Sequence, residues 1–191
     1  EYILGLENKD TVETTEKLLE KMNLKITGRK VVIPARKAAE EAHQKDKGHN
    51  GTFCGAAIEL SNKSIVTGKN SPLLHAESAV ILNAIKVLAG IPDSILLLSE
   101  EVIHQIKQFK TNAYNEGAGN LDIEETLIAL AISATTNPTA KLALDQLTKL
   151  KNMEMHSTHL LKRGDESPIR KLGINLTTDG KLTGTQLYFG N

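Results

Sequence analysis

The chain has 191 residues, and its 23 Lys plus Arg balance its 23 Asp plus Glu to a formal net charge of zero. This balance argues against a duplex nucleic-acid binder and against a polybasic membrane anchor, because both need an excess of positive charge. A hydrophobic content of 40% and a charged content of 24% are typical of a globular domain. The length indicates one domain with at most a small appendage.

Residue types limit the core and the compartment. With three Phe, three Tyr and no Trp, the core must be aliphatic, and few rings are available for stacking on bases or sugars. Cys54 is the single cysteine, which excludes an internal disulfide and a thiolate zinc site, so we expect a reducing, cytoplasmic compartment. The longest charge-free stretch, 126–140, is too short and too polar to span a bilayer. Because the chain begins at Glu1, we expect a fragment of a longer protein or a processed one.

The N-terminal half combines helical periodicity with one pair of strand-like runs. Apolar residues recur at helical spacing in three segments, and the second segment opens with a proline, where the missing N–H costs nothing. Two mostly apolar runs joined by turn-like residues predict a β-hairpin. The expected elements are a helix at 8–24, a helix at 33–42, strands at 52–60 and 64–68, and a helix from His75 to Gly90.

Beyond residue 90 the pattern alternates between helices and short strands. Ser99 can cap a helix whose first turn carries Glu100 and Glu101, which favour the helix dipole. The helix expected at 121–135 is apolar on nearly every face, so we place it inside the domain. The other expected elements are a strand at 95–98, a helix at 137–150, a strand at 153–161, a helix at 167–172, a strand at 174–177 and an edge strand at 186–189.

This alternation after an opening hairpin predicts an α/β fold of three layers, α/β/α, with a mixed sheet of about five strands and extra helices. We assign 1–32 to an N-terminal helical appendage, a remnant of a preceding domain or a linker. We assign 33–191 to the α/β domain, with a helical insertion at 121–151. The expected partners are the preceding N-terminal domain of a longer protein and a second copy of the chain. A small-molecule ligand is left open, and neither nucleic acid nor membrane is expected.

Several motifs between Pro34 and Phe109 resemble the cytidine-deaminase fold. Cys54-Gly-Ala-Ala-Ile58 is similar to its first strand, Thr67-Gly-Lys-Asn70 to its Thr-Gly-x-Asn turn, and His75-Ala-Glu77 to the motif that opens its second helix. The resemblance implies that the α/β domain is deaminase-like. In that family zinc is held by the motif's His or Cys and by two cysteines of a Pro-Cys-x-x-Cys motif, while the Glu shuttles a proton.

The sequence departs from that family where the two cysteines are expected. The segment Leu98–Val102 occupies the position, and Ser99 and Val102 stand where the thiolates would be. One imidazole is too few ligands for zinc. His156 and His159 are three apart on an expected strand, so they should point to opposite faces and should not chelate one metal. We therefore expect no metal and no cofactor.

A second resemblance covers most of the chain. Residues 79–92, 128–138, 155–158 and 170–177 are similar to the C-terminal part of a bacterial family known as domain of unknown function 1846. The resemblance implies a longer protein whose preceding region carries a Gly-rich stretch resembling a phosphate loop. It implies no activity. Nothing in this chain matches the phosphate-loop motif G-x-x-x-x-G-K-[ST].

Two functions of different classes follow. The leading hypothesis is a zinc-free, non-catalytic deaminase-like module for assembly or small-ligand binding, in which Glu77 only supports its helix start and His75 only packs locally. The alternative is an enzyme in which Glu77 is the acid/base, while His75 and Asn70 position a nucleobase-like or other small polar substrate. Ser99 is a further candidate ligand-binding residue, although N-cap duty alone explains it.

Two observations would separate these hypotheses. An enclosed cluster of His75, Glu77 and Asn70 favours the enzyme, and a pocket filled by Leu73 or Leu74 favours the module. Peptidase-type hydrolysis associated with the preceding region has no nucleophile–base pair in this chain to support it.

Overall fold

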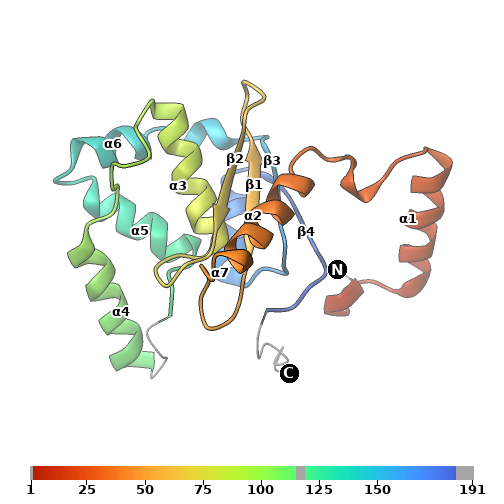
Figure 1. The fold of residues 1–191 in the computed structure, drawn as a ribbon, viewed down its shortest axis with the longest axis horizontal. Coiled ribbons are helices and arrows are strands. Elements are labelled where there is room, and N and C mark those ends of the chain that lie inside the picture. Colours follow the sequence, from red (N-terminus) through yellow and green to blue (C-terminus); the bar gives the residue numbers. More distant parts are fainter. Residues whose placement is uncertain (1, 115–118, 184–191) are drawn as a thin grey trace.

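Four strands form one open sheet in the computed structural model, which describes residues 2–114 and 119–183 (Figure 1). The order is β2-β1-β3-β4, and β1 is antiparallel to both neighbours while β3 and β4 are parallel. The strands are β1 (Gly55–Glu59), β2 (Ile65–Lys69), β3 (Glu154–Ser157) and β4 (Asn175–Thr178). The expected mixed α/β class is confirmed, with four strands in the described residues instead of about five.

Two expected strands account for the difference. The prediction for 95–98 is wrong, because this run forms no strand and leaves Ile95 and Leu96 exposed by 41% and 69%. Only Leu97 of the run is fully buried. Residues 95–98 cannot pair with β1, because β2 and β3 already lie on its two sides. These residues form part of a loop instead. The other expected strand, 186–189, lies outside the described residues.

The described residues also form seven α-helices and three short 3-10 helices. No helix in this part of the chain combines the length and the apolar character needed to cross a membrane. The α-helices are α1 (Lys9–Lys21), α2 (Val32–Gln44), α3 (Ala76–Ala89), α4 (Glu100–Tyr114), α5 (Ile123–Ser133), α6 (Pro138–Leu144) and α7 (Arg163–Lys171), and the 3-10 helices are η1 (Tyr2–Leu4), η2 (Ile26–Gly28) and η3 (Leu147–Leu150). Of these, α2, α3 and α7 are the helices that contact the strands most.

Local sequence explains where most of these helices begin and end. Asn8 caps α1, and Asn137 caps α6 with Pro138 as its first residue. Asp122 begins α5 in a capping box, in which its side chain accepts from the Glu125 N–H and the Glu125 side chain accepts in return from the Asp122 N–H. Gly90 ends α3 in the left-handed conformation, with φ of 67°.

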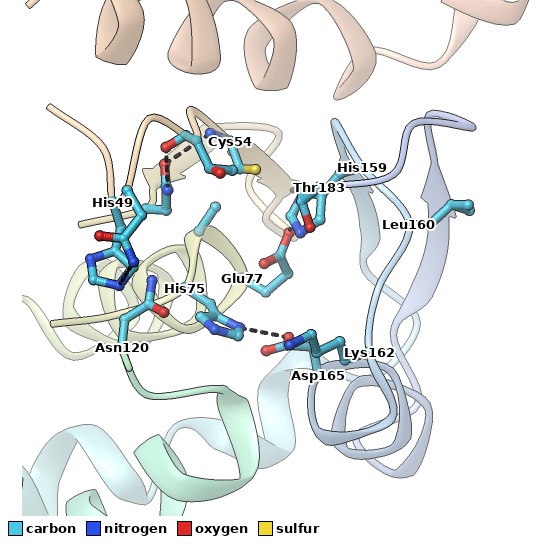
Figure 2. A pocket seen from close by; sticks show the side chains of 14 residues that line it. His49, Cys54, His75, Glu77, Asn120, His159, Leu160, Lys162, Asp165 and Thr183 are labelled. Carbon is cyan, nitrogen blue, oxygen red and sulfur yellow. Dashed lines mark hydrogen bonds and ion pairs between the residues drawn. The ribbon is translucent and has the colours of Figure 1, made fainter. Parts of the chain in front are cut away.

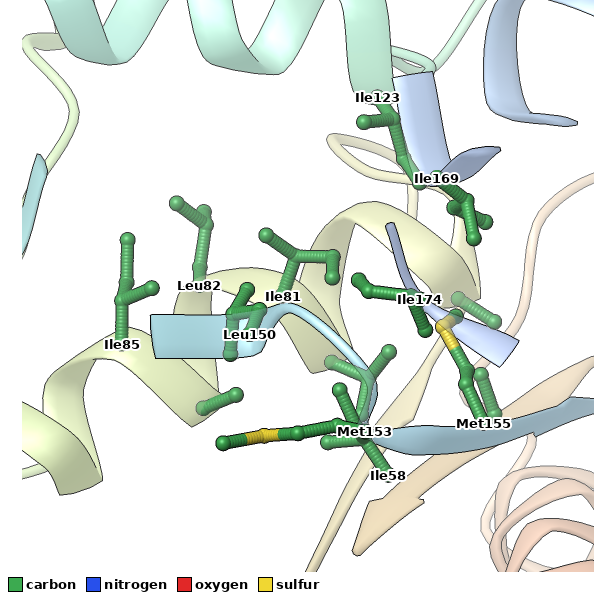
Figure 3. Close-up of a cluster of buried hydrophobic side chains, with 14 of the residues drawn as sticks. Ile58, Ile81, Leu82, Ile85, Ile123, Leu150, Met153, Met155, Ile169 and Ile174 are labelled. Carbon is green, nitrogen blue, oxygen red and sulfur yellow. The ribbon is translucent and has the colours of Figure 1, made fainter. Parts of the chain in front are cut away.

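Helices cover both faces of the sheet. Ala57 of β1 packs with Val31 and Ala35 at the start of α2, on one face. Ala56 and Ile58 point the other way, into a larger cluster built with α3, α5, α6 and α7. This cluster is aliphatic, as expected, and Figure 3 shows isoleucines, leucines and methionines from strands and helices meeting there.

The helix expected to be buried on nearly every face is only half buried. In α5, Ile123, Ala129 and Leu130 are fully buried, but Ile128 and Ile132 are 54% and 47% exposed. The buried side packs against α6 and α7. No described residue covers the opposite side enough to bury these isoleucines, so apolar composition alone overstated the burial of this helix.

Two glycines allow the helices to approach the sheet closely. A Cβ on Gly68 of β2 would lie 2.3 Å from the Val80 backbone nitrogen of α3. A Cβ on Gly55 of β1 would lie 2.3 Å from the Ala35 carbonyl oxygen of α2. Because these neighbours are backbone atoms, neither contact can be relieved by turning a side chain. The contact at Gly68 fixes the first turns of α3 against the sheet.

The substitution Gly68→Ala is expected to lower the free energy of unfolding by about 1–3 kcal/mol, because the added methyl group must push α3 away from β2. The matched control is Gly28→Ala, where an added Cβ meets nothing within 4 Å. The control should change stability by no more than about 0.5 kcal/mol. Urea unfolding of the three proteins measures both effects, and equal stabilities would contradict the close contact.

An ion pair links Arg36 of α2 to Asp179, the residue that follows β4. Arg36 donates two hydrogen bonds to the Asp179 carboxylate, at 3.0 and 2.6 Å. Burial alone would raise the pKa of Asp179, but the Arg36 guanidinium outweighs it and holds the pKa below its usual value. A carboxyl whose pKa is lower in the folded state stabilises the fold at neutral pH, and this contribution is lost as the carboxyl protonates.

We therefore expect Arg36→Gln to destabilise the protein by about 1–3 kcal/mol at pH 7. The difference from the wild type should shrink as the pH falls below about 4, because Asp179 without Arg36 takes up its proton at a higher pH than Asp179 of the wild type does. Urea unfolding at pH 7, 5 and 3.5 measures this, with Lys37→Gln as a control that removes an exposed charge from the same helix. A difference that stays constant over this pH range would rule out the ion pair as its source.

Candidate functional site

A cavity of about 450 Å³ lies where the starts of α3 and α7 meet the end of the sheet (Figure 2). We call it the His75 pocket. Its lining comes from six separate segments of the chain, and most of the lining residues carry polar or charged side chains. The lining residues are His49, Asn50, Thr52, Cys54, Asn70, His75, Ala76, Glu77, Asn120, His159, Leu160, Lys162, Asp165 and Thr183.

His75 and Asp165 join three helix starts. His75 is the N-cap of α3, and its ring nitrogen Nδ1 lies 2.7 Å from Oδ2 of Asp165, in the first turn of α7. The other carboxylate oxygen of Asp165 accepts a hydrogen bond of 3.0 Å from the backbone N–H of Ile123, at the start of α5. The backbone N–H of His75 donates to the Leu121 carbonyl oxygen, which ties the same two segments together again. The His75 ring is therefore held in one orientation.

Glu77 lies on the floor of the pocket and is fully buried. Its Oε1 accepts a hydrogen bond from the Ser157 hydroxyl at the end of β3, and Nδ1 of His159 lies 3.7 Å from the same oxygen. Figure 2 shows the Glu77 carboxylate directed toward His159. Its second oxygen, Oε2, has no hydrogen-bond partner among the described residues. Buried polar atoms are nearly always partnered, so this oxygen points to a proton, a water molecule, an ion or a ligand that completes the site.

Burial and crowded carboxylates shift the proton affinities of the pocket. Burial raises the pKa of Glu77, and the charge of Asp165 adds to the rise, while His159 and Ser157 oppose it without cancelling it. Burial also raises the pKa of Asp122, against the hydrogen bond from the Glu125 N–H. Burial lowers the pKa of His75, but the hydrogen bond and charge of Asp165 outweigh it and leave the pKa raised. Each of these shifts favours binding of a proton or another cation.

The structure brings three of the four predicted site residues to this pocket. His75, Glu77 and Asn70 line it. The side chain of Asn70 is already used on both sides, because its Oδ1 accepts from the Cys54 N–H and its Nδ2 donates to the Thr52 carbonyl oxygen, each at 2.8 Å. Asn70 therefore shapes the wall of the pocket. Ser99 is not among the lining residues, and its N–H donates to the hydroxyl of Ser133, at the end of α5.

The helix start that faces His75 is that of α7. The resemblance to the deaminase fold instead led us to expect Ser99 and Val102, at the start of α4, opposite His75. The physical reason for the difference is the path of the chain, because residues 90–153 run through α4, α5 and α6 before β3 enters the sheet beside β1. The helix that follows β3 is α7, so its first turn supplies Asp165 opposite His75.

Sequence reasoning did not identify Asp165, Ser157 or the contact of His159 with Glu77. The strand β3 ends at Ser157, so His159 lies in the loop that follows and turns toward Glu77. His156, on the strand itself, points elsewhere, with its Nδ1 2.9 Å from the Thr177 hydroxyl. The two histidines therefore lie in different surroundings, although not for the expected reason, because only His156 lies on the strand. The His-x-x-His spacing draws attention to His156 and His159 in the sequence. No pattern in the sequence around Asp165 indicates that this residue contacts His75.

A glycine allows the starts of α5 and α7 to meet. A Cβ on Gly164 would lie 2.1 Å from Oδ2 of Asp122, the N-cap of α5. A side chain at this position would have to displace the Asp122 carboxylate, whose Oδ1 caps α5. Gly164 is therefore part of the architecture of the pocket, although it has no chemistry of its own.

Cys54 lines the pocket beside Glu77 but is a poor nucleophile. Burial and the charge of Glu77 raise the pKa of its thiol to about 12. Thiols react as thiolates, so the folded protein should react very slowly with Ellman's reagent at pH 8, and protein unfolded in urea should react completely. Absorbance at 412 nm follows the reaction. Rapid stoichiometric reaction of the folded protein would show that Cys54 is accessible and ionised.

Comparison with known proteins identifies the family. The family model described as "Domain of unknown function DUF1846, C-terminal" matches residues 27–188. A UPF0371 protein of Clostridium botulinum strain Eklund 17B is 40% identical over 192 aligned residues, and one of strain ATCC 19397 is 41% identical. Each match covers 100% of this chain and 38% of the relative, so the chain spans little more than a third of the length of these relatives. The chain belongs to the DUF1846 family, and it matches the C-terminal domain of that family.

Proposed function

We propose that this domain carries the active site of an enzyme that acts on a small polar molecule bound in the His75 pocket. The observation that carries the proposal is the unpartnered, fully buried Oε2 of Glu77 at the floor of a cavity where His75, His159 and Asp165 converge. A carboxyl group kept from water is costly, and its retention beside two imidazoles is the pattern of sites that perform chemistry.

The lining of the pocket supports the enzyme over the non-catalytic module. A pocket filled by Leu73 or Leu74 would have favoured the module, and neither residue is among the described lining residues. Leu73 is 49% exposed, and Leu74 packs against the main core. The cavity is therefore open to a ligand at the position where Glu77 and His75 lie.

The arrangement assigns different tasks to its residues. Asp165 holds Nδ1 of His75, which leaves Nε2 of the same ring to interact with a bound molecule. Glu77 and the two imidazoles of the pocket are the groups that can exchange a proton with the substrate, and Ser157 and Asp165 orient them. Because no Phe, Tyr or Trp is among the described lining residues, a small polar substrate fits better than a stacked nucleobase.

We also propose a deaminase-like arrangement for this unit. The features that support it are the hairpin β1–β2, the His75-Ala-Glu77 motif at the start of α3, and a second helix start facing that motif. In this proposal α7 takes the place that the sequence alignment gave to α4, and a carboxylate stands where the family has thiolates. The chemistry is therefore expected to differ from that of the zinc deaminases.

We also infer the partners and the compartment of this domain. The matched relatives are much longer than this chain, so we infer that the domain works beside a further, N-terminal region, to which 1–32 connects. The single buried cysteine supports a reducing, cytoplasmic compartment. The exposed Ile128 and Ile132 of α5 support a contact with another copy of the chain.

A thermal-shift screen tests the proposed function. Nucleosides, nucleobases, amino acids and small amides are the probes, and at least one class should raise the melting temperature of the wild type. A ligand at about 100 times its Kd stabilises the folded state by about 2.7 kcal/mol. The shift should be lost in Glu77→Gln and in His75→Gln and kept in His104→Gln, a histidine on the exposed side of α4.

Melting of each variant without ligand separates loss of binding from loss of folding. A flat response of the wild type to all four classes would contradict the proposal. So would shifts that persist undiminished in folded Glu77→Gln and His75→Gln proteins.

A further inference from the structure

We infer that the floor of the His75 pocket binds one divalent transition-metal ion, with His75, Glu77 and Asp165 as its protein ligands. In the described residues these three side chains each offer a ligand atom, and the three atoms all lie within 4.8 Å of one another. Atoms at this spacing surround a point from which each can reach a metal ion with small side-chain adjustments. The typical metal–ligand distances are about 2.0–2.2 Å for these atoms.

The unpartnered oxygen of Glu77 is an independent observation that points to an ion. Glu77 and Asp165 are both buried, and the cationic partners that the described residues give them are two imidazoles, His159 for Glu77 and His75 for Asp165. Oε2 of Glu77 receives no hydrogen bond from any described residue. A dication placed between the carboxylates would neutralise their charge and coordinate the open oxygen.

The remaining contacts of these carboxylates are those expected of metal ligands. The Ser157 hydroxyl donates to Oε1 of Glu77, and the Ile123 backbone N–H donates to Oδ1 of Asp165. Glu77 thus has Oε1 fixed by the protein and Oε2 without a partner among the described residues. Both oxygens of Asp165 have a partner, because Oδ2 lies 2.7 Å from Nδ1 of His75, so Asp165 would coordinate the ion through a lone pair that these contacts leave unused. Hydrogen bonds of this kind orient ligands and are typical of protein metal sites.

The donor set indicates the class of metal. One imidazole nitrogen and two carboxylate oxygens suit Zn²⁺ or Mn²⁺ better than Mg²⁺, which prefers oxygen alone and keeps several waters. Three protein ligands leave a coordination position open toward the pocket, where a substrate oxygen could be polarised. The expected absence of metal considered positions 99 and 102 and the pair His156 and His159, whereas this set uses Asp165 of α7.

The inference deepens the proposed function, on which its catalytic meaning rests, but metal binding can be measured without any substrate. With the ion bound, Glu77 serves as a ligand, and His159 lies beside it. The ligand screen and a metal titration therefore report on separate claims.

Isothermal titration of the purified, chelator-treated chain without a histidine tag tests the inference, with ZnCl₂, MnCl₂ and MgCl₂ as probes. We expect one Zn²⁺ or Mn²⁺ per chain and weaker binding of Mg²⁺. Loss of a hydrogen bond that supports a ligand typically weakens metal binding by about 10- to 100-fold, and loss of the ligand itself should cost at least as much. Glu77→Gln and Asp165→Asn should therefore each weaken binding by about 100-fold or more. The matched controls, Glu101→Gln and His104→Gln on the exposed face of α4, should bind as the wild type does.

Circular dichroism and melting without metal establish that each variant is folded. If one carboxylate variant does not fold, the visible absorption bands of bound Co²⁺ are compared between the wild type and His75→Gln. These bands depend on the ligands of the ion, so they should change when His75 is replaced. The absence of saturable binding at millimolar Zn²⁺ and Mn²⁺ would overturn the inference. Weak binding that is unchanged in Glu77→Gln and Asp165→Asn, an adventitious ion only, would overturn it as well.

These outcomes distinguish the two proposals. Metal binding without any small-molecule response would leave the metal site standing and remove support for the proposed function. A small-molecule response that depends on Glu77 in protein that binds no metal would leave a metal-free acid–base site.

Discussion

The site depends on one carboxylate, Asp165, which is shared by three helix starts. Its two oxygens contact the His75 ring at the N-terminus of α3 and the Ile123 N–H at the N-terminus of α5, while its own backbone belongs to the first turn of α7. A buried carboxylate is stable only where hydrogen bonds and positive charge compensate for the lost water. The helix starts and the imidazole provide that compensation, so packing of the helices and orientation of His75 have one common cause.

The sheet provides the rigid reference for this arrangement. Gly68 lets α3 approach β2 to within backbone contact, and Ser157, at the end of β3, reaches Glu77 from the other side. Glu77 is therefore fixed by the sheet, and His75 by the helices, although the two residues are neighbours in one motif. The hydrogen bond from Ser157 and the nearby His159 imidazole compensate in part for the burial of the Glu77 carboxyl among aliphatic side chains.

Local signals predicted the parts of the fold that local physics determines. Caps, a hairpin turn and helical periodicity located α1, α2, β1, β2 and α3 to within a few residues, and a short motif identified His75 and Glu77. The strand expected at 95–98 failed because pairing depends on a partner elsewhere in the chain. Asp165 escaped notice because it contacts His75 across 90 residues of sequence, and Ser157 contacts Glu77 across 80. Such contacts follow from the order of strands in the sheet, which no local pattern encodes.

The missing side chain at Gly164 has a consequence for evolution and for engineering. Even one methyl group there would collide with the Asp122 carboxylate and disturb the hydrogen bond by which that carboxylate caps α5. A random-mutagenesis survey of this protein should therefore find an intolerant position that bears no functional group. The cost of a side chain there would measure how firmly the carboxylate that caps α5 is held in its place.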